Sequence, residues 1–228
     1  MNLSTLAVGG ALLLMTICVY IYEHRKIKSM ELAVIVSLAV VAGISRIPFA
    51  GIPSVQPTTF IVLLSGYVFG PFMGCVIGFL AAWISNFFLL HGPWTIWQMF
   101  AWGLVGLSGG FAGRVVPVPL RDRFLNKKRL NLSRLEPVPY VGAYSNTLLL
   151  LILGFVWGFL FGWLMNLWYW MAYAYPLNFN TWLSVNVSSF LFESAHAGAN
   201  VVLILFFGKP LLKILFRFRN KLYPNLEK

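Results

Sequence analysis

Long runs of mostly apolar residues constrain the fold of this chain more than any other feature. Seven runs can be traced, at residues 4–22, 31–45, 58–70, 72–90, 96–113, 144–170 and 187–207. Such runs are typical of membrane spans, because a helix satisfies its own backbone hydrogen bonds in hydrocarbon. The chain is also 59% hydrophobic and only 10% charged, unlike a soluble domain. We therefore expect an all-α integral membrane protein.

The basic residues lie almost entirely on one side of this arrangement. They follow the first run, the fifth run and the seventh run, so that 16 of the 17 Lys and Arg share one side and Arg46 alone falls on the other. Cytoplasmic loops of membrane proteins carry an excess of Lys and Arg. The pattern predicts a multi-pass protein with its N-terminus outside and its C-terminus in the cytoplasm. It also explains the net charge of +11 by topology, with the lipid bilayer and not a nucleic acid as the partner.

The runs divide the chain into three parts. Residues 1–30 are expected to form an N-terminal transmembrane helix and a basic cytoplasmic linker, because the charges follow the apolar run instead of preceding it as in a signal peptide. Residues 31–210 are expected to form the main membrane domain, and residues 211–228 a basic cytoplasmic tail. The longest polar connection, 114–143, is expected to be a cytoplasmic linker.

The run 58–70 is too short to cross a bilayer without help. Thirteen residues span about 20 Å, against roughly 30 Å of hydrocarbon. The preceding stretch "RIPFAGIPSVQPTT" has three prolines and apolar residues on both sides. We expect it to be a loop that dips into the helix bundle, where protein groups can satisfy its backbone.

Small residues recur at helical spacing and predict where helices pack closely. We expect internal packing for three such faces: Gly66, Gly70, Gly74, Gly78 and Ala82; Gly103, Gly106, Gly110 and Gly113; and Gly154, Gly158 and Gly162. The second run has two pairs of small residues four apart, Ala33 with Ser37 and Ala39 with Gly43. Periodicity leaves open whether these pairs pack internally or offer a flat face to another protein.

Polar residues interrupt the last run in "SVNVSSFLFESAHAGANVVLILFFGKP". Glu193, His196 and Asn200 share one helix face. A charged residue at membrane depth costs at least about 2.5 kcal/mol, so this face should point into the bundle or a cavity. Two compatible interpretations follow: the residues bond neighbouring helices, or they border a pocket open to the outside.

Several other unusual residues fall on the predicted outer side. Aromatic residues gather at any membrane interface, but beside buried polar groups they also suit a mostly apolar binding pocket. The candidate substrate-binding residues are Arg46, Gln56, Asn86, His91, Trp94, Trp97, Trp102, Glu193 and His196.

Catalytic motifs are scarce. Glu193 and His196 form half of a di-iron motif, but the chain has only six acidic residues. It has no HExxH, GxSxG or phosphate-binding glycine loop, and Cys18 and Cys75 belong to no metal cluster. We expect no catalytic residues and no metal site. Two alternatives stay open: an intramembrane enzyme acting on lipid with Glu193 and His196 as acid and base, and a structural subunit without a ligand.

The tract "RIPFAGIPSVQPTTFIVLLSGYVFGPFMG", followed by "HGPWTIWQMFAWGLVG", resembles the substrate-binding S components of energy-coupling factor vitamin transporters, and most of all the cobalamin-specific ones. The resemblance covers roughly residues 31–207. It implies a six-helix S-component bundle in a bacterial plasma membrane, with the substrate held near the outer surface under loops. The run 4–22 would then be one additional N-terminal helix.

The resemblance also implies partners and residue roles. S components work with a transmembrane coupling subunit and two cytoplasmic ATPases, which bind ATP and magnesium, so this chain itself would bind no cofactor. Ala33 and Ser37 match an Ala-x-x-x-Ala docking surface, with Ser in place of the second Ala. Arg46 and Gln56 would lie on the lid.

The resemblance implies that the substrate is cobalamin or a related corrinoid. A queuosine precursor or another vitamin is the alternative.

Overall fold

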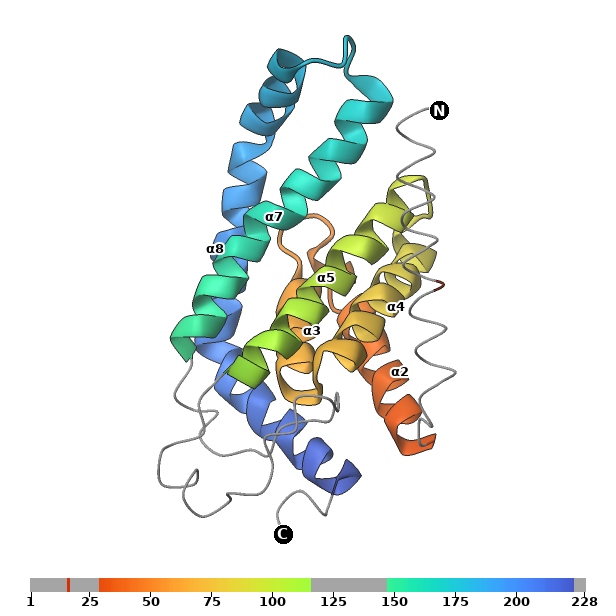
Figure 1. Cartoon of the computed structure of the whole chain (residues 1–228), viewed down its shortest axis with the longest axis vertical. Helices are drawn as coiled ribbons and strands as arrows, with labels where there is room; N and C mark the ends of the chain where they lie inside the picture. Colours follow the sequence, from red (N-terminus) through yellow and green to blue (C-terminus); the bar gives the residue numbers. More distant parts are fainter. Residues whose placement is uncertain (1–15, 17–28, 116–146, 224–228) are drawn as a thin grey trace.

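The computed structural model describes residue 16 and residues 29–115 and 147–223. This part of the chain contains six α-helices, one short 3-10 turn and no strand, as the all-α prediction requires. The elements are α2 (Ser29–Ile44), η1 (Ile47–Phe49), α3 (Pro57–Phe69), α4 (Pro71–Leu89), α5 (Trp94–Val115), α7 (Thr147–Tyr173) and α8 (Phe179–Leu222) (Figure 1). The expected additional helix 4–22, apart from residue 16, and most of the linker 114–143 lie outside the described residues.

Four helical stretches of the described part are long and apolar enough to cross a membrane. They cover Ser29–Phe49, Pro71–Leu89, Thr147–Tyr173 and Phe179–Leu222. The Gly-rich and Trp-rich α5 is not among them, although it has 22 residues. Together these helices indicate a multi-pass membrane protein.

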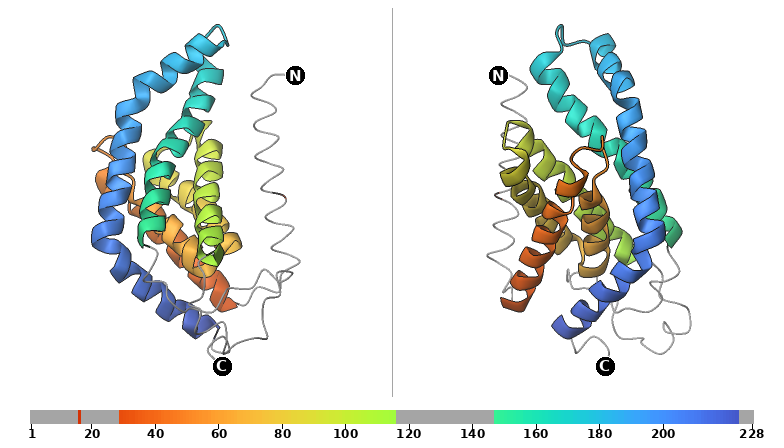
Figure 2. Two further views of the ribbon diagram at one scale, coloured as in Figure 1. Left: turned by 60° about the vertical axis from the view of Figure 1, so that its left-hand side comes forward. Right: turned by 180° about the vertical axis from the view of Figure 1, so that it is seen from behind.

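The short helix α3 forms the centre of the bundle. All of its 13 residues are buried, and it packs against α2, α4, α5, α7 and α8 (Figures 1 and 2). A helix that is apolar on every side is stable when other helices surround it. Protein and not lipid surrounds α3, so its length does not have to match a bilayer.

Glycines bring α3, α4 and α5 together backbone to backbone. A methyl group added at Gly66 would overlap the carbonyl of Gly106, and one added at Gly106 would overlap the carbonyl of Gly74. On α7, a methyl group at Gly158 would overlap the backbone of Ala197 on α8. The prediction of internal packing is confirmed for these glycines but is wrong for Gly70, which lies between α3 and α4 with a φ of 95° and has nothing within 4 Å of an added methyl group.

The structure separates the two small-residue pairs of α2. Ala39 is fully buried, and a methyl group at Gly43 would lie 2.8 Å from the carbonyl oxygen of Ala81 on α4. Ala33 and Ser37 are exposed. One pair therefore packs inside the bundle, and the other lies on its surface.

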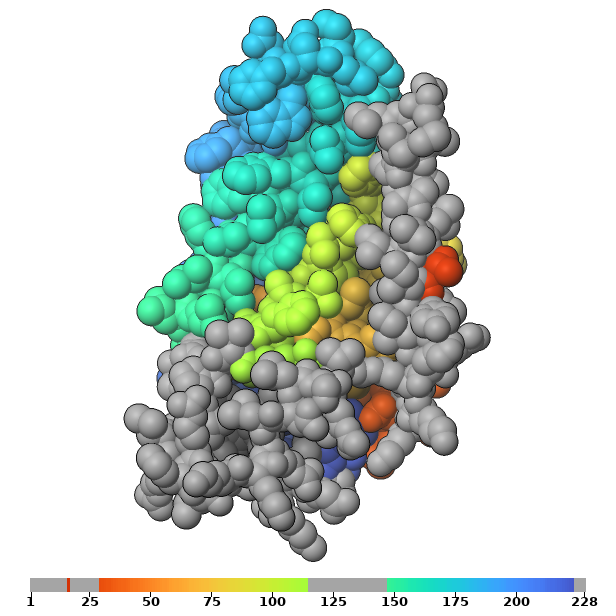
Figure 3. Space-filling view, viewed as in Figure 1, coloured from red at the N-terminus to blue at the C-terminus, as the bar shows by residue number. Residues whose placement is uncertain are grey.

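Helices α7 and α8 form a long hairpin that extends past the end of α5 (Figures 1 and 3). α8 has 44 residues, far more than the predicted run 187–207. It begins early because Asn178 and Thr181 form a capping box, in which Thr181 N–H donates to Asn178 Oδ1 at 3.0 Å. It also continues through Pro210, so the expected tail is helical as far as Leu222.

The glycine contacts generate a stability prediction. Gly106→Ala should lower the stability of the fold by about 1–3 kcal/mol, because its methyl group would collide with the α4 backbone. The measurement is the thermal unfolding temperature of the purified protein in detergent. The matched control is Gly198→Ala on α8, where nothing lies within 4 Å of the new methyl group. Equal unfolding temperatures for the two variants would contradict the packing analysis.

Candidate functional site

The Pro-rich stretch forms a self-bonded loop between α2 and α3. Phe49 N–H donates to the Arg46 carbonyl at 3.1 Å, and Ile52 N–H donates to the Phe49 carbonyl at 2.9 Å. The tip of the loop around Ile52 is exposed, whereas its ends at Arg46 and Gln56 are half-buried. The expectation that the whole loop dips into the bundle is therefore wrong for the tip. The η1 part of the loop packs against α4, and the right-hand view of Figure 2 shows the loop between α4 and α8 in projection.

A buried hydroxyl connects three helices below this loop. Thr59 Oγ1 on α3 accepts from Trp102 Nε1 on α5 at 2.9 Å and pairs with His196 Nε2 on α8 at 2.8 Å. The indole N–H can only donate, which leaves the hydroxyl hydrogen available to His196 Nε2. Thr59 and Trp102 are fully buried and His196 is 2% exposed, so each of these bonds is shielded from solvent.

Arg46 lies against the same network. Its guanidinium carbon lies 4.9 Å from the centroid of the Trp102 ring, within cation–π range. Its Nη1 donates to Ser85 Oγ on α4 at 3.3 Å. The one basic residue expected on the outer side is thus held over the Thr59–Trp102–His196 network.

Glu193 has a separate set of partners. Its Oε1 accepts from Asn166 Nδ2 on α7 at 2.7 Å and from Ser189 Oγ at 2.8 Å. A methyl group at Gly162 would lie 2.9 Å from this oxygen, so the glycine on α7 makes room for the carboxylate. The other oxygen, Oε2, is buried and has no hydrogen-bond partner.

The prediction that the polar face of α8 points into the bundle is confirmed. Glu193 is 3% exposed, and Asn200 is fully buried and donates from Nδ2 to the Gly154 carbonyl at 2.9 Å. Glu193 bonds towards α7, whereas His196 bonds towards α3. Both residues therefore join helices, and they do so in different directions. A pocket open to the outside beside them stays a prediction.

Two of the candidate residues lie in other surroundings. Asn86 Nδ2 donates to Thr95 Oγ1 at 3.0 Å and to Gln98 Oε1 at 2.7 Å, which fastens α4 to α5. His91 is exposed, and its ring lies 4.8 Å from that of Phe87. The structure does not bring these two residues into the network around Thr59.

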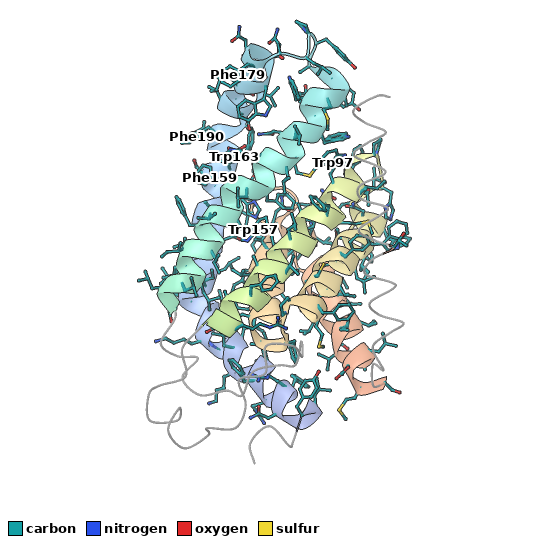
Figure 4. The ribbon with its side chains drawn as sticks, viewed as in Figure 1. Trp97, Trp157, Phe159, Trp163, Phe179 and Phe190 are labelled. Carbon is teal, nitrogen blue, oxygen red and sulfur yellow. The ribbon has the colours of Figure 1, made fainter. Side chains whose placement is uncertain are left out.

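The three candidate tryptophans follow α5 from its start. Trp94 packs edge-to-face against Trp168 of α7, with ring centroids 6.0 Å apart. Trp97 is half-buried near the same end of α5 (Figure 4). Trp102 lies deeper and is fully buried. Trp94 and Trp97 thus lie near the start of the helix, while Trp102 belongs to the polar network.

Thr59, Asn166 and Ser189 take part in the site but are missing from the sequence-based candidates. Asn166 carried a usable signal, because a lone amide in an apolar run needs a partner for the same reason that Glu193 does. Thr59 carried no comparable signal, since a threonine can bond to its own helix backbone.

The described residues provide hydrogen-bonding groups and not a metal centre. No group of three or more His, Cys, Asp or Glu side chains in these ranges is placed to hold a metal ion. Three buried acceptors of the described residues lack partners: Glu193 Oε2, Gln56 Oε1 and Asn200 Oδ1. The arrangement can therefore accept hydrogen bonds from a ligand that donates them.

Comparison with known proteins shows a distant and partial similarity. No family model and no solved structure matches the chain. A UPF0397 protein of Vibrio atlanticus (strain LGP32) is 30% identical over 77 residues, 32% of this chain and 42% of that protein. A UPF0397 protein of Aliivibrio fischeri (strain MJ11) is 26% identical over 95 residues, 40% of this chain and 51% of that protein. The matches thus cover only 42% to 51% of the relatives' lengths, and their name states no activity.

The Thr59 hydroxyl yields a testable consequence. Thr59→Val should leave two buried groups, Trp102 Nε1 and His196 Nε2, without their Thr59 partner. Each unpaired group should destabilise the fold by about 1–3 kcal/mol. Thr58→Val is the matched control. The Thr58 and Ser45 hydroxyls both donate to the Ala42 carbonyl, so the carbonyl still has a partner when Thr58 is replaced. The thermal unfolding temperature in detergent measures the loss of stability in both variants. An equal loss in the two variants would contradict a special role for Thr59.

Proposed function

We propose that this chain is the substrate-binding membrane subunit of an energy-coupling factor importer in a bacterial plasma membrane. In this proposal its N-terminus lies outside and its C-terminus in the cytoplasm. The observation that carries the proposal is the polar network of Arg46, Thr59, Trp102 and His196 below the α2–α3 loop. The helix count, the Pro-rich loop and the resemblance of its sequence to S components support the same conclusion.

The unpartnered acceptors support a ligand that donates hydrogen bonds. Gln56 Oε1 lies at the end of the α2–α3 loop, and Glu193 Oε2 lies on the α7–α8 hairpin. Cobalamin, or a related corrinoid, has amide N–H groups around its edge and is the proposed substrate. A queuosine precursor, with its own N–H donors, is the alternative.

In this proposal the α2–α3 loop is the lid. Glu193 and His196 are almost completely buried, so a ligand would reach them only after part of the protein moves, and the proposal assigns that movement to the loop. The loop bonds mainly to itself, and its tip is exposed. Trp94 and Trp97 would supply apolar walls beside it. Transport energy would come from ATP and magnesium bound by two partner ATPases, acting through a membrane coupling subunit.

Ligand binding tests the proposal directly. The purified chain should release or take up heat on titration with cobalamin in the absence of ATP, and a parallel titration with a queuosine precursor distinguishes the two substrates. Glu193→Gln should weaken binding about tenfold or more, because a hydrogen bond to a charged acceptor contributes about 1.5–3 kcal/mol. Glu31→Gln is the matched control, since Glu31 bonds to Tyr223 instead.

Two outcomes would overturn this assignment. The absence of heat with either ligand would remove both substrates. Turnover of a lipid by the native chain, lost in Glu193→Gln while binding stays intact, would favour the intramembrane enzyme.

The exposed pair on α2 gives the second prediction of the proposal. Ala33→Leu combined with Ser37→Leu should strongly reduce co-purification of the coupling subunit, because bulky side chains prevent close helix contact. Ligand binding to the isolated chain should stay unchanged. Ala195→Leu, at an exposed alanine of α8, is the control and should leave co-purification intact. Undiminished co-purification of the double variant would refute docking at this face.

A further inference from the structure

The last part of α8, residues 209–222, here called the basal segment, runs below the bundle. It follows the bend of α8 and passes below α3 to the start of α2 (Figures 1 and 2). Its inward face is mostly apolar, with Leu212, Leu215 and Leu222 buried, and it also carries the buried Arg219. Just after it, Tyr223 Oη donates to Glu31 Oε1 on α2 at 2.7 Å. The basal segment is therefore joined to the rest of α8 at one end and bonded to α2 just after the other.

Its outward face carries a regular row of positive charge. Lys209, Lys213, Arg217 and Lys221 are all exposed and recur at every fourth position, so they share one side of the helix. A row of charges alone is most often a solvated surface. Here, however, large apolar side chains accompany it: Ile214 and Phe218 are each 49% exposed.

The charged and apolar side chains meet in one place. Ile214, Arg217, Phe218 and Lys221 line a surface pocket on the basal segment. Two cations beside two apolar groups match the two parts of a phospholipid, a phosphate and its hydrocarbon chains. An amphipathic helix with basic and apolar faces is also typical of the boundary between headgroups and acyl chains.

We propose that the basal segment binds an anionic phospholipid of the cytoplasmic leaflet. The headgroup phosphate lies between Arg217 and Lys221, while Ile214 and Phe218 contact the acyl chains. Lys209 and Lys213 extend the positive surface along the same leaflet. The inference rests on the membrane orientation of the proposed function, and it does not depend on which substrate the outer site binds.

Native mass spectrometry of the full chain in detergent tests this inference. The protein is supplied with equal amounts of phosphatidylglycerol and phosphatidylcholine, and the retained lipids are counted. We expect a preference for phosphatidylglycerol that falls about tenfold or more in R217Q/K221Q, because each basic residue near an anionic headgroup adds several-fold to the affinity. The preference should also weaken as salt is raised, since salt screens exposed charges.

Two control variants separate the pocket from general charge. R217K/K221R keeps the charges and should keep the preference. K26Q/K28Q removes two positive charges elsewhere on the predicted cytoplasmic side and should keep it too. Equal retention of the two lipids by the native chain would overturn the proposal, as would an unchanged preference in R217Q/K221Q.

Discussion

Polar groups inside an apolar bundle must bond to other protein groups, and the arrangement of this chain depends on that requirement. A charged or hydroxyl group that loses water and gains no partner is costly. The Thr59 hydroxyl meets the requirement for Trp102 and His196 together, and so joins α3, α5 and α8 at one point. Asn166 and Ser189 meet it for one oxygen of Glu193. Gln56 Oε1, Glu193 Oε2 and Asn200 Oδ1 stay without partners, and the proposed function assigns the first two to the ligand.

Close packing of glycines makes this network possible. Gly66, Gly74 and Gly106 let three helices touch through their backbones, and this proximity places the α3 hydroxyl within reach of the α5 indole. The α7–α8 hairpin is different, because its outer part exposes large apolar residues such as Phe190 and Leu191. The closely packed helices α3, α4 and α5 thus form one side of the site, and the α7–α8 hairpin forms the other.

Both proposals place residues on the same helix. Glu193 and His196 lie in its outer half, and Arg217 and Lys221 lie near its cytoplasmic end in the proposed orientation. Helix α8 is continuous between them, with Pro210 inside it. A lipid bound at the basal segment would therefore restrain the helix that holds one wall of the outer site. In these two proposals, the connection would give the long α8 a role beyond spanning the membrane.

The sequence by itself determined the class of protein, the order of the helices and the inward direction of Glu193 and His196. These properties are local, because they follow from the cost of moving side chains between water and hydrocarbon and from helical spacing. It also predicted the glycine faces. It did not predict that His196 bonds to Thr59, which is 137 residues away in the chain.

Only the tertiary structure decided which helix faces are exposed on the surface of the bundle. It placed Ala39 and Gly43 against α4 while it left Ala33 and Ser37 exposed, although both pairs have the same spacing. It also left the loop tip outside and folded the expected tail into the basal segment. Periodicity cannot distinguish such cases, because it describes one helix, whereas exposure depends on every helix that packs around it.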